Sequence, residues 1–147
     1  MDKPLKIAAL DSEDLDVVSS HLQDAIIRLD DIRFLRRQKK FVIVANRFDW
    51  LSARGRNTGQ RCRCGVTINT VTAARSQKIR QGAGDAVISF LAMRFDAKGE
   101  GPEGVITLEF SGGGRVQLDV ECIEVQMEDL GPVWKTPNIP SHNLDEE

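Results

Sequence analysis

The residues best suited to chemistry in this sequence stand together in the stretch Asn46-Arg47-Phe48-Asp49-Trp50. The stretch ends a run of Val, Ile and Phe that is typical of a strand, and it opens a glycine-containing loop, where binding sites often lie. Arg47 and Asp49 fall on the same face of a strand, and tryptophan is a common anchor for protein partners. We therefore predict binding residues at Asn46, Arg47, Asp49 and Trp50. In the alternative, Arg47 and Asp49 pair with neighbouring strands while the rings pack in the core.

His21 and Asp24 form a second candidate binding pair. They are three residues apart on a predicted helix, a spacing at which a carboxylate can orient an imidazole for general-base catalysis. No serine or cysteine can be assigned as a nucleophile beside them, so we assign no catalytic residue and no cofactor. An enzyme that used His21, Asp24, Arg47 or Asp49 would need a concave pocket that gathers these side chains.

Three cysteines, Cys62, Cys64 and Cys122, are an odd number and lack the spacing of a disulfide scaffold. With His21 or His142 they would supply four metal ligands. Structural zinc sites, however, normally show two close pairs of ligands, and this chain offers one. We therefore predict reduced thiols and no metal site, which fits a cytoplasmic protein.

Charge is segregated along the 147 residues, although the formal net charge is only −2. Residues 1–27 hold two basic and six acidic residues, residues 28–80 hold 14 and three, and residues 81–147 hold four and 13. We expect basic and acidic strands to neutralise each other across a sheet. The alternative is a nucleic-acid surface in the basic block, and its phosphate-binding residues would be Arg33, Arg36, Arg37, Lys39, Lys40, Arg54, Arg56, Arg61 and Arg63.

The elements that must position these residues are one helix and several strands. A helix is predicted over residues 12–25, because Asp11 is a suitable N-cap and apolar residues recur at helical spacing from Leu15 to Ala25. The longest uncharged run, residues 86–93, is too short to cross a membrane, so we expect no membrane association. Strands are predicted at residues 5–9, 26–29, 32–35, 41–48, 62–73, 86–95, 105–110 and 115–127.

The C-terminal part carries the clearest local signals. Strands 105–110 and 115–127 flank Ser111-Gly-Gly-Gly114, whose glycines supply positive φ at no steric cost. The apolar alternation of the second strand changes phase at Cys122-Ile123, which predicts a β-bulge there. Residues 131–147 contain prolines and end in three acidic residues, so we expect a tail that does not pair as a regular strand.

These elements predict an α+β domain over residues 1–130. One N-terminal helix would pack on a strongly bent antiparallel sheet of about seven strands. The sheet is expected to form a half-barrel that resembles pleckstrin-homology-like domains, although the helix of those domains usually comes last in the chain.

Four segments together resemble an uncharacterised bacterial family, domain of unknown function 2948, which is found mainly in alphaproteobacteria. The likeness runs nearly from end to end of the chain. It implies a small intracellular protein and brings no activity with it. The segments are His21-Leu-Gln-Asp-Ala25, Asn46-Arg-Phe-Asp-Trp50, Gly112-Gly-Gly114 with Val120-Glu-Cys-Ile-Glu124, and Asp129-Leu-Gly-Pro-Val-Trp134.

The sequence leaves three functional hypotheses. The first is a non-catalytic binding or adaptor module for a protein partner, anchored by Trp50 and Trp134. The second is a nucleic-acid-binding protein that uses the basic block, residues 28–80. The third is a small-molecule enzyme at His21, Arg47 and Asp49. Neither the partner nor the oligomeric state follows from the sequence.

Overall fold

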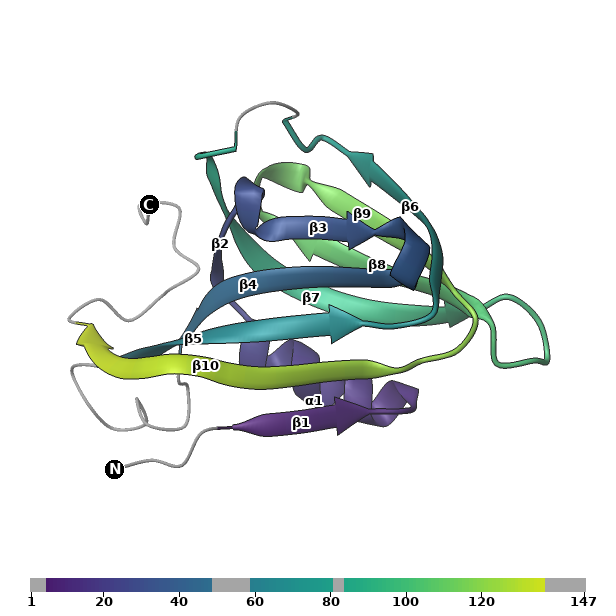
Figure 1. Cartoon of the computed structure of the whole chain (residues 1–147), viewed down its shortest axis with the longest axis horizontal. Helices are drawn as coiled ribbons and strands as arrows, with labels where there is room; N and C mark the ends of the chain where they lie inside the picture. The colour runs from purple at the N-terminus through teal and green to yellow at the C-terminus, as the bar shows by residue number, and fades with distance from the viewer. Residues whose placement is uncertain (1–4, 49–58, 81–83, 137–147) are drawn as a thin grey trace.

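One helix and ten strands make up the parts of the chain that the computed structural model describes, residues 5–48, 59–80 and 84–136 (Figure 1). The elements are β1 (Lys6–Ala9), α1 (Ser12–Leu22), β2 (Ile26–Arg28), β3 (Ile32–Leu35), β4 (Lys40–Phe48), β5 (Gly59–Ile68), β6 (Val71–Gln77), β7 (Val87–Ala97), β8 (Gly104–Phe110), β9 (Arg115–Val120) and β10 (Val125–Thr136), with 3-10 turns η1 (Leu29–Asp31), η2 (Arg36–Gln38) and η3 (Ser111–Gly113). The α+β class is confirmed, but the expected number of about seven strands is too low.

All ten strands belong to one antiparallel sheet that does not close into a barrel. Its order is β1-β10-β5-β4-β2-β7-β8-β9-β6, and β3 pairs with β4 off this path. The sheet bends strongly, so that β6, at one end of the order, comes back to the turn before β4. There the Val71 N–H donates to the Lys39 carbonyl at 2.8 Å. This contact joins the free side of β6 to the β3–β4 connection.

The helix forms where it was predicted but ends earlier. The Asp11 side chain caps its start by accepting from the Asp14 N–H at 2.8 Å, and its apolar side chains are buried in the core. It ends at Leu22 because the next residues bond to β7. Asp24, at φ 64°, donates its N–H to the Phe90 carbonyl at 2.8 Å, and the Phe90 N–H donates to the Ala25 carbonyl at 2.8 Å. Helix α1 packs against β7 and β1 (Figure 1).

Both long predicted strands are interrupted at one corner of the sheet. The predicted strand over residues 62–73 turns at Thr70, which has a φ of 57°, and the one over residues 115–127 breaks at residues 121–124. The expected β-bulge at Cys122-Ile123 is therefore wrong. The change of phase marks the passage from β9, which pairs with β6 and β8, to β10, which pairs with β1 and β5.

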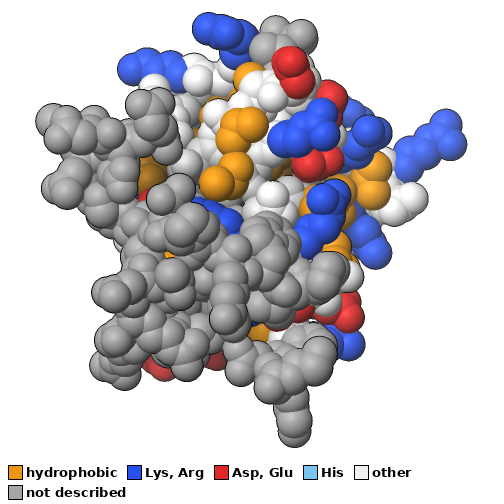
Figure 2. All heavy atoms as spheres, turned by 90° about the vertical axis from the view of Figure 1, so that its left-hand side faces the viewer, with side chains coloured by type: hydrophobic (Ala, Val, Ile, Leu, Met, Phe, Trp, Pro, Cys, Tyr) orange, Lys and Arg blue, Asp and Glu red, His pale blue; other side chains and the backbone are white. Residues whose placement is uncertain are grey.

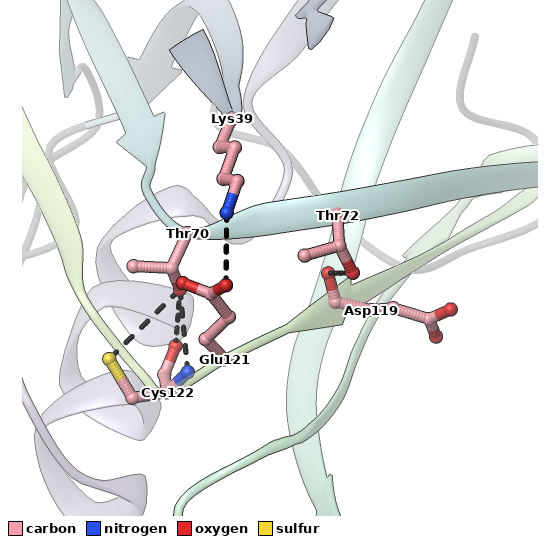
Figure 3. A network of polar contacts seen from close by, with 6 residues as sticks. All are labelled: Lys39, Thr70, Thr72, Asp119, Glu121 and Cys122. Carbon is pink, nitrogen blue, oxygen red and sulfur yellow. Dashed lines mark hydrogen bonds and ion pairs between the residues drawn. The ribbon is translucent and has the colours of Figure 1, made fainter. Parts of the chain in front are cut away.

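Polar contacts hold these two turns together (Figure 3). The Thr70 hydroxyl donates to the Cys122 carbonyl at 3.1 Å, and the Cys122 N–H donates to the same hydroxyl at 3.3 Å. Lys39, also left-handed at φ 55°, places its Nζ 3.0 Å from a Glu121 carboxylate oxygen. Three distant parts of the chain thus meet at this corner.

The C-terminal strand corrects a second expectation. The chain beyond residue 130 was expected not to pair, yet β10 continues to Thr136 opposite β5. The register shifts between Asp129 and Val133, and this irregularity accommodates Pro132, which lacks an N–H for a ladder bond. The positive φ predicted for the glycine turn is confirmed at Gly112 and Gly113.

No helix in the described ranges combines the length and the hydropathy that a membrane span requires.

We predict that the corner is a local determinant of stability. Thr70→Val removes the hydroxyl and leaves the Cys122 N–H and carbonyl without this partner, which should lower the free energy of unfolding by about 1–3 kcal/mol. Thr72→Val is the matched control, because the Thr72 hydroxyl is exposed and makes one bond of 3.3 Å to the Asp119 carbonyl. It should cost less than about 0.5 kcal/mol. Urea unfolding measures the free energy of unfolding of both variants. Equal losses would contradict the prediction that the corner is a local determinant of stability.

Candidate functional site

Arg47 occupies an ion pair in the interior, which matches the alternative stated for this residue rather than an exposed binding site. Its Nε and Nη2 donate to the two carboxylate oxygens of Asp129 on β10, both at 2.9 Å. The side chains are 7% and 4% exposed. Because β5 lies between β4 and β10 in the sheet, the pair spans one intervening strand.

Asp129 is further held by the backbone of Leu5, close to the N-terminus. Its Oδ2 accepts from the Leu5 N–H at 2.7 Å, and its own N–H donates to the Leu5 carbonyl at 2.9 Å. Burial by itself raises the pKa of Asp129, but the hydrogen bonds from Arg47 and Leu5 and the guanidinium charge outweigh it. The net result is a lowered pKa, so Asp129 stays ionised in the folded protein.

The other predicted site residues are dispersed. Asn46 borders a hollow of about 70 Å³ together with Arg63, which is too small for an ordinary ligand. Asp49 and Trp50 lie outside the described residues, so their predicted role stays a prediction. His21 is in the last turn of α1, and Asp24 follows the helix near Arg61, where its carboxylate opposes the lowering of the Arg61 pKa by burial.

The three cysteines are free in the structure and differ in burial. Cys62 and Cys64 are buried on the same face of β5, and Cys122 is partly buried at the corner. Burial raises the pKa of the Cys64 thiol to about 12, and burial together with the Asp129 carboxylate raises the pKa of Cys62. Within the described ranges no three His, Cys, Asp or Glu side chains cluster as metal ligands.

The predicted phosphate-binding residues separate into two groups. The first lies on β3 and around η2, where Arg33, Arg36, Arg37 and Lys40 are exposed. Lys39, by contrast, pairs with Glu121. The second lies on β5, where the half-buried Arg61 guanidinium stands over the Phe48 ring, 5.5 Å from its centroid. Arg63 of the same strand is exposed, and Arg54 and Arg56 lie outside the described residues.

The expected neutralisation between the basic and acidic blocks is partial in the described chain. Three ion pairs join the two blocks, Lys39–Glu121 at 3.0 Å, Arg47–Asp129 at 2.9 Å and Arg75–Asp119 at 2.9 Å.

A cavity of about 530 Å³ lies between β3 and β6, and none of the predicted site residues that the structure describes lines it. The two strands meet near Lys39 and Val71 and diverge from there (Figure 1). β3 pairs with β4 and β6 with β9, and within the described chain neither has a strand on its other side. The lining residues are Leu29, Asp30, Ile32, Phe34, Phe41, Ala74, Arg75, Ser76, Ile79, Arg80, Gly84 and Val116.

Sequence reasoning missed this cavity because its lining comes from segments far apart in the chain. A strand was predicted at residues 32–35, where Ile32 and Phe34 alternate with Arg33. Nothing in the sequence indicated that Ala74 and Ile79 would face that strand across a gap. The closest signal was Ile79 itself, an isolated apolar residue between Lys78 and Arg80.

We predict that the Arg47–Asp129 pair makes stability depend on acid pH. Because the pKa of Asp129 is lower in the folded state than its unfolded value of 3.8, its contribution is complete well above that value and is lost as pH falls through the folded pKa. Asp129→Asn should cost about 3–5 kcal/mol near neutral pH, since it leaves a buried guanidinium without its counter-charge. It should also flatten the acid limb of a stability–pH curve.

Asp96→Asn is the control for this experiment, because Asp96 is 67% exposed in its ion pair with Arg94. It should change stability by less than about 1 kcal/mol. If the two variants lose the same free energy of unfolding, the buried pair contributes no more to stability than the exposed one.

We also predict an order of thiol modification. Iodoacetamide at neutral pH should modify Cys122 before the two buried thiols of β5, and Cys64 should react only after unfolding, because the thiolate is the reactive form. Mass spectrometry of native and urea-treated protein reads this order directly. Early modification of Cys64 in the native protein would contradict it.

Comparisons with known proteins give a family but no activity. No curated protein and no solved structure shows a significant match to the sequence. One family model, described as "Protein of unknown function (DUF2948)", matches residues 5–142, which is nearly the whole chain and includes every described strand. The chain therefore belongs to the family of proteins of unknown function DUF2948.

Proposed function

We propose that the protein is a non-catalytic binding module that accepts an extended segment of a protein partner between β3 and β6. The cavity between these two strands carries the proposal. At about 530 Å³ it is within the range of sites that enclose ligands, roughly 300–1,000 Å³.

The edge of β6 that has no strand beside it in the described chain is the part of the cavity best suited to a peptide. An extended chain that adds to an open sheet edge gains main-chain hydrogen bonds, and pockets for alternate side chains supply specificity. Strand β6 has seven residues, three more than β3, and it lies at the end of the sheet. Alternate side chains of the added strand would point toward the apolar floor at Phe34, Phe41 and Val116.

The position of Arg47 gives the enzyme hypothesis less support. The enzyme hypothesis needs His21, Arg47 and Asp49 around one pocket, whereas Arg47 is buried against Asp129. Among the described residues that line the cavity between β3 and β6, neither His21 nor Arg47 is present. Three free cysteines support a reducing compartment, and the proposed location is the cytoplasm.

We also propose that the curled sheet corresponds to a pleckstrin-homology-like half-barrel with its helix moved to the start of the chain.

We predict that a library of random extended peptides will yield ligands that require this cavity. Ala74→Trp places an indole in the gap and should weaken the selected peptides at least tenfold, because about 1.4 kcal/mol of lost contact corresponds to a factor of ten. Ala92→Trp is the matched control, since Ala92 is exposed on β7 and does not line the cavity. Fluorescence anisotropy measures the dissociation constants, and thermal unfolding checks that both variants fold.

The bound state gives a second readout that does not depend on a variant. Intermolecular cross-strand nuclear Overhauser effects should connect the peptide to residues of β6. Selected peptides that bind Ala74→Trp as tightly as the unaltered protein, or that contact other strands, would overturn the proposal.

A further inference from the structure

The two chain segments that flank the cavity are strongly basic. Residues 28–40 and 71–80 together contain nine Lys and Arg residues and two Asp residues. The end of the molecule on the left of Figure 1 shows the same kind of surface. In its upper half, hydrophobic side chains lie between groups of Lys and Arg, and Asp or Glu side chains accompany only some of them (Figure 2).

Three of the nine cations already have a carboxylate partner. Arg28 lies 3.8 Å from Asp30, and the pairs Lys39–Glu121 and Arg75–Asp119 are shorter. The other six make no ion pair with any residue in the described part of the chain, and all six are exposed. They are Arg33, Arg36, Arg37, Lys40, Lys78 and Arg80.

Two of these unpaired cations stand at opposite ends of the cavity. The Arg36 guanidinium lies 5.0 Å from the centroid of Phe34, a lining residue, and η2 adjoins the closed end where Lys39 meets Val71. Arg80 lies beyond the other end of β6 and itself lines the cavity. An apolar floor therefore has a guanidinium at each end.

From this arrangement we infer that the bound segment is acidic at both ends, with an apolar middle that packs on Phe34 and Val116. The inference rests on the proposed function and adds the chemistry of the partner. Carboxylates would neutralise Arg36 and Arg80, which the protein leaves without an acidic partner among its described residues, and guanidinium–carboxylate bonds are among the stronger hydrogen bonds. Asp30, the acidic residue among the described lining, lies beside Gly84 and 3.8 Å from Arg28, and it makes no ion pair with Arg36 or Arg80.

Three synthetic peptides test the inference. They share a central Val-Thr-Val-Thr-Val and carry two Glu, two Gln or two Lys at each end. We expect the Glu peptide to bind about tenfold more tightly than the Gln peptide, since two exposed charge pairs of up to about 1 kcal/mol each add to the same backbone pairing. The Lys peptide should bind most weakly. Added salt should bring the three dissociation constants together, because exposed charges are screened.

Variants of the protein locate the preference. Arg36→Gln and Arg80→Gln should each reduce the ratio between the Glu and Gln peptides, and together they should abolish it. Arg63→Gln is the matched control, because Arg63 is an exposed arginine of β5 that does not line this cavity. An unchanged ratio in the double variant would overturn the inference.

The outcomes separate this inference from the proposed function. Equal binding of all three peptides would overturn the acidic preference and leave the peptide-binding function in place. If none of them binds, and the random library also yields no ligand, both fail. An oligothymidylate that binds with a steep salt dependence, unaffected by Ala74→Trp, would assign the basic residues to nucleic acid and overturn the inference.

Discussion

The hydrogen bonds between Thr70 and Cys122 join the two turns on which the shape of the sheet depends. A sheet of ten strands rarely stays open and regularly twisted, because the twist of each strand accumulates and wide sheets curl, split or flatten. Strands β1–β5 and β10 form one half of the sheet, and β6–β9 form the other. The chain passes between these halves twice, from β5 to β6 and from β9 to β10, and both passages occur at this corner. The left-handed backbone of Thr70 is uncommon for a β-branched residue, and its hydroxyl provides the compensating bonds.

The position of this corner explains why the sheet stays open. The Lys39–Val71 hydrogen bond brings β6 against the turn before β4, and from there β3 and β6 diverge instead of pairing. On another part of the sheet α1 supplies Leu15, Val18 and Leu22 to the common core. No described element supplies apolar side chains to fill the space between β3 and β6. Apolar residues such as Phe34 therefore line a cavity there. The proposed binding function follows from this difference.

Charge is distributed by the same geometry. Arg47 and Asp129 come from the basic and acidic blocks, and they lie where β4 and β10 are separated by one strand, so the pair is buried. Such a pair offsets its desolvation through bidentate geometry and through the added Leu5 bond to the carboxylate. The cations of β3, η2 and the end of β6 lie at the open side of the sheet instead. Most of them remain without an internal partner in the described chain and are available to an external one.

Local patterns in the sequence were enough to determine several elements. The Asp11 cap, the apolar stripe of α1, and the glycine turn with its positive φ depend on neighbours within a few residues, so they could be predicted. The end of the helix could not, because β7 competes for the backbone of Asp24 and Ala25. The phase change at Cys122-Ile123 was a real signal, but a β-bulge and a passage between two strands leave the same pattern in a sequence.

Only the tertiary structure decided which side chains meet. From the sequence, Arg47 stood among candidate binding residues, and only the strand order brings it to Asp129, 82 positions later in the chain. The cavity depends even more on distant segments, since the residues that line it extend from Leu29 to Val116. Composition and periodicity report the neighbours of a residue along the chain. A strand edge left unpaired, by contrast, is a property of the whole sheet, because it depends on where every other strand has gone.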